Sequence, residues 1–303
     1  MPEPFPIIEI SADAAQAQEP MGTKYKFWLR HPELGQCLFK MARPNTGEDW
    51  SEKIAAELCN LLGLPHARYE LASWQDHPGI VSPTFLTANT TLLHGNDILA
   101  GLVSSYPRDT AYNQSQHTLT SVINALSLEG LRLPLNWSAP DGINSPVSVF
   151  VGYLLLDAWI GNGDRHHENW GFVLQLPQGI PHLAPTYDHA SCLGRELQDA
   201  KRQNRLQNKM VENYAQKSRS AFYEQVTDKR TITTFDTFAK IAKKYPKSAA
   251  VWLNHLAHIT DTEVNACIRR IPEHRISPVA CEFTAQMLSF NQTRLLNLQE
   301  DLS

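Results

Sequence analysis

Residues 161–172 read GNGDRHHENWGF, and they follow the apolar run YLLLDAWI at residues 153–160. Positions 164–169 of this stretch hold an Asp, an Arg, two His, a Glu and an Asn. Ser145 and Pro146 form a good N-cap and first-turn pair, so we expect a helix from there to about Ile160. The polar cluster therefore begins where an apolar helix ends, which predicts a functional loop at that point.

A β-hairpin is predicted directly after this cluster. Its strands are GFVLQL (171–176) and HLAPTYD (182–188), and the turn residues PQG lie between them. Because a hairpin brings its two ends together, Asn169 and Asp188 should face one another, with Asp164 nearby. Three oxygen-bearing side chains at one place suit Mg²⁺. Phosphoryl transfer uses such a set together with a lysine that binds the phosphates.

An upstream lysine of this kind is Lys40. It lies at the end of a first predicted hairpin, formed by KYKFWL (24–29) and QCLFKM (36–41) around a turn with Pro and Gly. Two further strands are predicted at 68–74 and 79–87, and Pro83 interrupts the second of them. The first part of the chain is therefore expected to be rich in strands.

One helix is predicted among these strands, over residues 45–65. Thr46 or Asp49 can cap its start, and Gly63 suits the left-handed residue that ends a helix. Trp50, Ile54, Leu58 and Leu61 form one apolar stripe at helical spacing.

Two glutamates of this helix compete as the ion-pair partner of Lys40. A helical wheel places Glu57 with Lys53 on the polar face. Glu52 falls instead among small residues, where another element can approach closely. We therefore predict that Glu52 pairs with Lys40 and that Glu57 is solvated.

The composition is that of a globular protein, with 42% hydrophobic and 19% charged residues in a chain of 303. The net charge of −4 gives no nucleic-acid footprint, so we expect no direct nucleic-acid partner. The five scattered cysteines, the lack of a signal-like start and the lack of a membrane-length apolar run favour a cytoplasmic protein with no membrane partner.

The order of the predicted elements defines the fold class. Strands dominate the early part of the chain, and helices dominate from about residue 92 onward. This order predicts an α+β fold with a small mixed N-lobe over residues 1–90 and a larger, mainly helical C-lobe over residues 91–303.

The motif D-R-H-x-x-N at residues 164–169 resembles the catalytic loop of atypical kinases with the protein-kinase-like fold. Both phosphoinositide kinases and HipA-like serine/threonine kinases share this motif. The HipA-like pattern G-N-x-D-x-H-x-x-N, followed by P-x-Y-D-x-x-S, is matched by residues 161–169 and 185–191. The helix that starts with Glu52 and ends in Leu-Gly-Leu at residues 62–64 is similar to that family as well. The sequence thus resembles a HipA-like kinase over roughly residues 20–290.

This resemblance implies a bilobal fold and ATP- and Mg²⁺-dependent phosphoryl transfer to Ser or Thr of a protein substrate. It implies that Asp164 is the catalytic base, that Asn169 and Asp188 bind Mg²⁺, and that Lys40, held by Glu52, binds phosphates. The remaining cofactor-site residues that it implies are Gly22 and Lys26 near the phosphates, Phe85, Leu86 and Thr87 near the adenine hinge, and His166 in support of the catalytic loop.

The sequence departs from the family pattern in the phosphate loop. Gly22 is the one glycine there, and residues 12–24 contain no serine that could carry a regulatory phosphate. These departures keep two other functions open. One is a small-molecule or lipid-head-group kinase, and the other is a nucleotide-binding pseudokinase that acts as a partner protein. A toxin-like kinase with an antitoxin-like regulator is a further possible role.

Several residues near the motif have alternative interpretations. Arg165 could contact a phosphate or a backbone carbonyl, whereas Asp157 is interpreted as structural and His167 as an exposed neighbour of the loop. Residues 201–230 hold eight Lys or Arg and three Asp or Glu, a local net charge of +5. This stretch is either a docking segment for an acidic or nucleic-acid-associated substrate or a solvated helix face.

Overall fold

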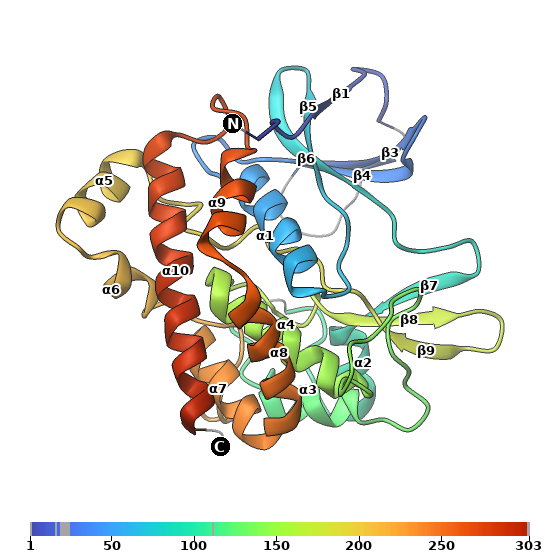
Figure 1. Cartoon of the computed structure of the whole chain (residues 1–303). Helices are drawn as coiled ribbons and strands as arrows, with labels where there is room; N and C mark the ends of the chain where they lie inside the picture. Colours follow the sequence, from blue (N-terminus) through green and yellow to red (C-terminus); the bar gives the residue numbers. More distant parts are fainter. Residues whose placement is uncertain (1, 16, 19–24, 111, 302–303) are drawn as a thin grey trace.

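The computed structural model describes residues 2–15, 17–18, 25–110 and 112–301, and it has two lobes (Figure 1). The N-lobe contains a six-stranded sheet with the strand order β1-β5-β6-β4-β3-β2. Its pairs are antiparallel except for β1 with β5, which is parallel. The strands of this sheet are β1 (Ile7–Ile10), β2 (Ala17–Gln18), β3 (Lys26–His31), β4 (Gly35–Met41), β5 (Glu70–Trp74) and β6 (His77–Pro83).

The predicted first hairpin is confirmed as β3 and β4. In its register Lys26 lies opposite Lys40, so the two lysines share one face of the sheet. Phe27 and Phe39 pack with Trp74 on the opposite face, with ring centroids 5.1 to 6.4 Å apart. An aromatic core on one side of the sheet therefore leaves the lysine side facing the other lobe.

Helix α1 (Glu48–Leu62) crosses beneath this sheet and ends, as predicted, at Gly63 in the left-handed conformation with φ 74°. The predicted side-chain cap is wrong, because Gly47 occupies the N-cap position without a side-chain hydrogen bond. The Thr46 hydroxyl donates to the carbonyl of Arg43 instead. Asp49 is buried within the first turn, where its carboxylate pairs with Arg275 at 2.8 Å.

The C-lobe combines a three-stranded sheet with the remaining helices. Its sheet, in the order β7-β8-β9, contains the predicted second hairpin. The strands are β7 (Thr90–His94), β8 (Gly171–Gln175) and β9 (Ile180–Leu183). The helices are α2 (Gly95–Leu102), α3 (Leu119–Leu126), α4 (Pro146–Ile160), α5 (Asp199–Gln207), α6 (Val211–Ala215), α7 (Thr234–Lys244), α8 (Pro246–His258), α9 (Asp261–Arg269) and α10 (Pro278–Asp301).

Helix α4 forms the centre of the C-lobe and is buried on all sides, which fits its nearly continuous apolar sequence. Its predicted N-cap is confirmed, since the Ser145 hydroxyl accepts a hydrogen bond from the amide of Ser148. One hydrophobic core joins this helix to α1 through residues such as Trp50, Leu58 and Trp159. Helix α1 is therefore packed against the C-lobe as well as against its own sheet.

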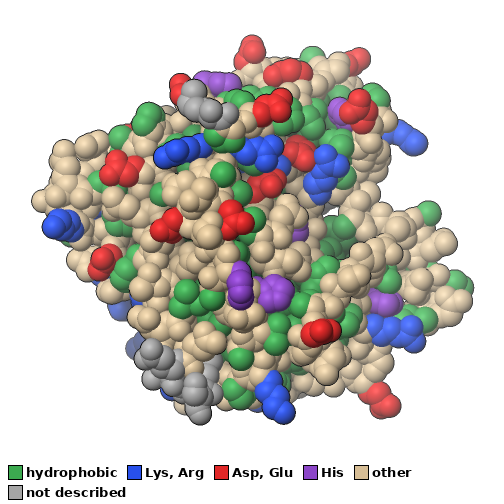
Figure 2. Space-filling view, in the orientation of Figure 1, with side chains coloured by type: hydrophobic (Ala, Val, Ile, Leu, Met, Phe, Trp, Pro, Cys, Tyr) green, Lys and Arg blue, Asp and Glu red, His purple; other side chains and the backbone are tan. Residues whose placement is uncertain are grey.

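The strand-rich and helix-rich parts confirm the predicted α+β bilobal architecture. Figure 2 shows a notch at the right-hand edge of the molecule, between the N-lobe strands and the C-lobe sheet. All five cysteines are free thiols. Within the described residues, no helix is both long and apolar enough to cross a bilayer.

The cap of α4 gives a first test of the fold. Replacing Ser145 by Ala removes the hydrogen bond to the Ser148 amide and should lower the free energy of unfolding by about 1 kcal/mol. Urea denaturation followed by circular dichroism measures this change. Ser289→Ala, at an exposed position inside α10, is the matched control and should leave the stability nearly unchanged. Equal effects of the two variants would contradict the capping role.

Candidate active site

The loop after α4 is held by a buried ion pair. The Arg165 side chain is 1% exposed, and its Nε and Nη2 donate to the two carboxylate oxygens of Asp157 at 2.6 and 2.7 Å. Its Nη1 donates to the carbonyl of Asn169 at 3.1 Å. Of the two partners considered for Arg165, a phosphate and a backbone carbonyl, the structure shows the carbonyl, together with the carboxylate of Asp157. Asp157 is structural, as predicted.

Asp164 lies at the start of this loop with its side chain 29% exposed. The amide oxygen of Asn162 accepts a hydrogen bond from the Asp164 amide at 3.2 Å, and Ser191 donates its hydroxyl to Asp164 Oδ2 at 3.2 Å. The side-chain nitrogen of Asn169 donates to the Asp164 carbonyl at 2.6 Å. These contacts fix the carboxylate of Asp164 and the amide of Asn169 relative to each other.

Asp188 follows β9 and reaches the N-lobe. Its carboxylate Oδ1 lies 3.1 Å from Nζ of Lys40, and its amide donates to the hydroxyl of Tyr69 at 2.9 Å. Its backbone is left-handed, with φ 59°, a conformation that Asp adopts more readily than most residues. The hairpin thus brings Asp188 to the lysine that the sequence singled out.

The predicted direct pair between Lys40 and Glu52 is wrong for this structure. Glu52 is fully buried, and its Oε1 accepts the amide of His189 at 2.6 Å. Its Oε2 has no hydrogen-bond partner among the described residues. The physical reason is that Asp188, and not Glu52, contacts the ammonium group of Lys40. A helical wheel of α1 cannot show this, because Asp188 belongs to another element.

Glu52 nevertheless acts on Lys40 through space. Burial lowers the pKa of the Lys40 ammonium, but the negative charges of Asp188 and Glu52 more than offset burial, and the net pKa is raised. The charge of Asp164 acts in the same direction. Lys40 is therefore held protonated although its side chain is almost fully buried.

One pocket between the lobes gathers most of the predicted cofactor residues. It is lined, among others, by Lys26, Lys40, Phe85, Leu86, Asn169 and Asp188. Phe85 stacks on the ring of Tyr187 at a centroid distance of 5.9 Å, which connects the end of the N-lobe to the hairpin. Thr87 does not line this pocket, and its amide donates to the hydroxyl of Thr90. Gly22 lies outside the described residues.

The donor set of this pocket fits a divalent cation with a polyphosphate. The Asn169 side-chain nitrogen donates to the Asp164 carbonyl, so its oxygen remains as an acceptor in the pocket that Asp188 also lines. Oxygen ligands of this kind suit Mg²⁺ when phosphates and water complete the shell. Lys26 and Lys40 lie opposite each other on adjacent strands, and such a like-charge pair is stabilised by a bound anion.

The histidines of the loop have different surroundings. His166 Nε2 lies 3.8 Å from Asp164 Oδ1, and its ring packs edge-on against Tyr112. The prediction that His167 is exposed is wrong, because it is 1% exposed and bonds through Nδ1 to the Tyr106 hydroxyl at 2.8 Å. Burial, aided by His166, lowers the pKa of His167 to about 4, so this ring is neutral at physiological pH.

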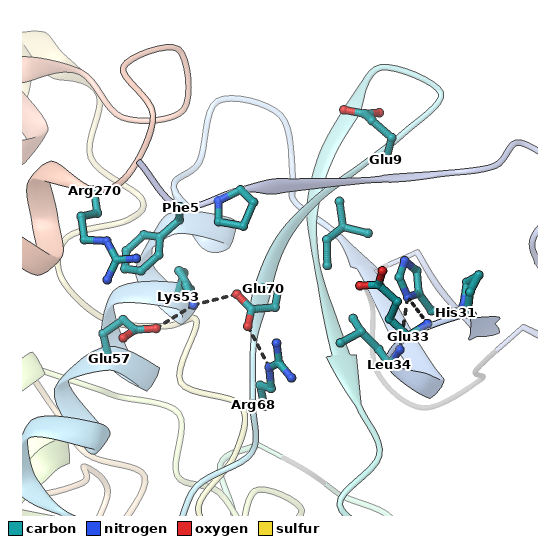
Figure 3. Close-up of a pocket in the computed structure, with 13 residues that line it drawn as sticks. Phe5, Glu9, His31, Glu33, Leu34, Lys53, Glu57, Arg68, Glu70 and Arg270 are labelled. Carbon is teal, nitrogen blue, oxygen red and sulfur yellow. Dashed lines mark hydrogen bonds and ion pairs between the residues drawn. The ribbon is translucent and has the colours of Figure 1, made fainter. Parts of the chain in front are cut away.

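A second recess, of about 730 Å³, lies on the N-lobe away from the catalytic loop (Figure 3). It explains why the predicted polar face of α1 is wrong. Lys53 is buried there, with Nζ 4.4 Å from the centroid of the Phe5 ring. Its Nζ pairs with Glu57 at 2.6 Å and with Glu70 at 2.8 Å. Glu57 is thus half-buried and paired, because the N-terminal segment covers this side of the helix.

Sequence reasoning assigned no role to three residues of the site. Ser191 matches the family-like motif and proves to donate to the Asp164 carboxylate. Asn162 also lies within the motif and holds the Asp164 amide. Tyr69, which accepts the Asp188 amide, carries no motif signal and could be found only in three dimensions.

Two solved structures have this arrangement of lobes. The chain is similar to the Helicobacter pylori proinflammatory kinase CtkA, with a TM-score of 0.76, 19% identity and coverage of 98% of this chain and 100% of that chain. It is also similar to a chain of the toxin–antitoxin complex of HipA, HipB and operator DNA from Shewanella oneidensis MR-1. In that case the TM-score is 0.54 at 10% identity, with coverage of 95% and 68%. No protein-family model and no curated protein sequence matches the chain.

These similarities define the class of fold. The chain has a bilobal, atypical protein-kinase-like fold. More particularly, it has the fold of HipA-like kinases, as the patterns at residues 161–169 and 185–191 predicted.

The buried ion pair under the catalytic loop gives a second test. Arg165→Met leaves the Asp157 carboxylate buried without its cation and should lower the free energy of unfolding by about 3 to 5 kcal/mol. Replacing both residues, as Asp157→Leu with Arg165→Met, removes the buried charge and should recover part of that loss. Denaturant unfolding of the single and double variants measures both effects.

The matched control is Arg68→Met. Arg68 pairs with Glu70 but is 62% exposed, so its loss should change stability by less than about 1 kcal/mol. An effect of Arg165→Met as small as that of Arg68→Met would show that the pair does not hold the loop.

Proposed function

We propose that this protein is a kinase that transfers phosphate from ATP, with Mg²⁺, to a Ser or Thr hydroxyl of a protein. The single observation that carries the proposal is the meeting of Lys40, Asn169 and Asp188 in one pocket between the lobes, with the Asn169 side chain bonded to the carbonyl of Asp164. Phosphoryl transfer depends on this combination of charge stabilisation and positioning.

Asp164 is proposed to accept a hydrogen bond from the attacking hydroxyl and to take its proton. Its Oδ2 already accepts the Ser191 hydroxyl, which limits the rotation of the carboxylate. Asn169 and Asp188 would hold Mg²⁺, which when bound neutralises charge on the phosphates. Lys40 and Lys26 would bind phosphate oxygens from the N-lobe side.

The exposure of the site favours a macromolecular acceptor over a small molecule. The Asp164 side chain is about one-third exposed, and the Tyr112 ring beside His166 is 58% exposed. A small substrate is generally enclosed by its pocket, whereas a protein segment can dock on such an open surface. A small-molecule or lipid-head-group kinase and a pseudokinase are the outcomes to be separated by experiment.

The first functional prediction concerns the two aspartates. Asp164→Asn should reduce phosphate transfer by about 10²- to 10⁴-fold, because the amide cannot accept the proton. Asp188→Asn should abolish Mg²⁺-dependent transfer, because a charged metal ligand is lost. Transfer is measured by intact-mass spectrometry of the protein and of a cell extract after incubation with ATP and Mg²⁺.

Thermal shift with ATP, with and without Mg²⁺, is the companion measurement. Asp164→Asn should keep the shift, since this residue does not line the nucleotide pocket. Full transfer by either variant would overturn the proposal. Strong nucleotide binding by the unmodified protein without any transfer to protein, inositides or small alcohols would favour a pseudokinase.

The second functional prediction separates the two glutamates of α1. Glu52→Gln keeps the hydrogen bond from the His189 amide but removes the charge that acts on Lys40, so we expect the transfer rate to fall about tenfold or more. Glu57→Gln is the matched control on the same helix. It contacts Lys53 outside the nucleotide pocket and should leave the rate within about twofold. Equal rates for the two variants would exclude a role of Glu52.

A further inference from the structure

The basic stretch at residues 201–230 concentrates positive charge, and few of its cations pair with carboxylates. Of its eight cations, only Arg202 makes an ion pair within the described residues, with Asp199 at 2.7 Å. In the N-lobe, by contrast, Arg43, Lys53 and Arg68 all pair with carboxylates. The stretch therefore presents positive charge that the described part of the chain does not neutralise.

This stretch also passes directly against the catalytic loop. A Cβ atom added at Gly163 would lie 2.8 Å from the carbonyl oxygen of Arg219, and one added at Gly161 would lie 3.0 Å from Oγ of Ser218. Gly163 immediately precedes Asp164 in the chain, and Gly161 lies three residues before it. The close approach needs residues without a side chain, and it places the backbone of 218–219 beside the proposed catalytic base.

The side chains of this segment alternate between solvent and interior. Lys217 and Arg219 are exposed, whereas Ser218 is half-buried and Ser220 is buried. Backbone bonds to 232–234 hold the segment, with the Thr234 amide on the Ser218 carbonyl at 3.0 Å and the Ser220 amide on the Ile232 carbonyl at 2.9 Å. Lys217 thus lies in the turn after α6 and Arg219 in a bridge to Thr233, where its guanidinium donates to the carbonyl of Thr231, and both side chains are exposed.

The same segment continues to the other side of the catalytic loop. His117 Nδ1 bonds to the carbonyl of Ala221, and its ring stacks on Phe222 at a centroid distance of 4.5 Å. The Trp170 indole donates to His117 Nε2 at 3.2 Å. His117 therefore connects the loop that carries the exposed Tyr112 to the basic segment and to the catalytic loop.

We propose that the segment at residues 217–219 forms the docking surface for the acceptor and that Lys217 and Arg219 select a Ser or Thr flanked by acidic residues. This inference rests on the proposed kinase function and names the class of its substrate. A protein segment is favoured over a nucleic acid, because the whole chain carries a net charge of −4 and the backbone that carries Arg219 lies against Gly163, next to Asp164, where a hydroxyl must arrive.

The test is a binding measurement that does not require transfer. Three fluorescent peptides of equal length carry one central Ser flanked by Glu, by Gln or by Lys, and their binding to the full chain is followed by anisotropy. The Glu peptide should bind most tightly, with an affinity that falls as salt is raised. The double variant Lys217→Gln, Arg219→Gln should weaken its binding by about fivefold or more and leave the Gln peptide nearly unchanged.

The matched control is the double variant Lys243→Gln, Lys247→Gln, which removes two exposed cations of α7 and α8 and should not change binding of the Glu peptide. Equal binding of all three peptides, or equal loss in the control variant, would overturn the inference. Tighter binding of a single-stranded oligonucleotide than of the Glu peptide would overturn it too.

Transfer assays with the same peptides separate this inference from the proposed function. Phosphorylation of the Gln and Lys peptides as efficiently as the Glu peptide would leave the kinase function standing and remove the acidic preference. Selective binding of the Glu peptide, lost in the variant, without transfer to any peptide or extract protein would support the docking surface and count against the kinase function.

Discussion

The buried ion pair between Asp157 and Arg165 is the constraint on which the site depends. Helix α4 is apolar and buried along its whole length, and it carries one carboxylate into the core near its end. An unpaired charge at that depth would cost several kcal/mol, so Arg165 must return to it after the turn. This ion pair fixes the backbone conformation of the loop between the two residues. Arg165 also donates to the carbonyl of Asn169, and this bond holds the last residue of the motif in place.

The first turn of α1 extends this constraint to the segment after Asp188. Ser51 donates its hydroxyl to the carbonyl of Ala190 at 2.9 Å, and Glu52 accepts the His189 amide. Glu48 pairs with Arg195 at 2.8 Å. Because α1 is also packed into the core of the C-lobe, the segment that carries Asp188 is held by both lobes, and its left-handed backbone is fixed by its surroundings.

Sequence reasoning was most reliable where the decisive contacts are local. One hairpin brings Asn169 and Asp188 to the same pocket, as the pattern of strands and turns predicted, although the second strand ends at Leu183 and not at Asp188. The prediction that Lys53 lies on a solvated face was wrong. Phe5 and Glu70, distant in sequence, cover a helix face that periodicity alone marks as polar. The prediction that His167 is exposed was wrong for the same reason, since Tyr106 contacts it from a loop that has no periodic pattern of hydrophobic residues. In both cases, contacts with residues distant in sequence determined the burial of the side chain, and local propensity did not.

Lys40 keeps its positive charge in a buried position because more than one carboxylate acts on it. Burial alone would favour a neutral amine, yet three carboxylates surround the ammonium, and Asp188 is the one in contact. If a metal ion engaged Asp188, the charges of Glu52 and Asp164 would still favour the protonated form. The unpaired Oε2 of Glu52 offers a second hydrogen-bond acceptor inside the protein. Asp188 is therefore the contact of this lysine, whereas Glu52 and Asp164 stabilise its charge through space.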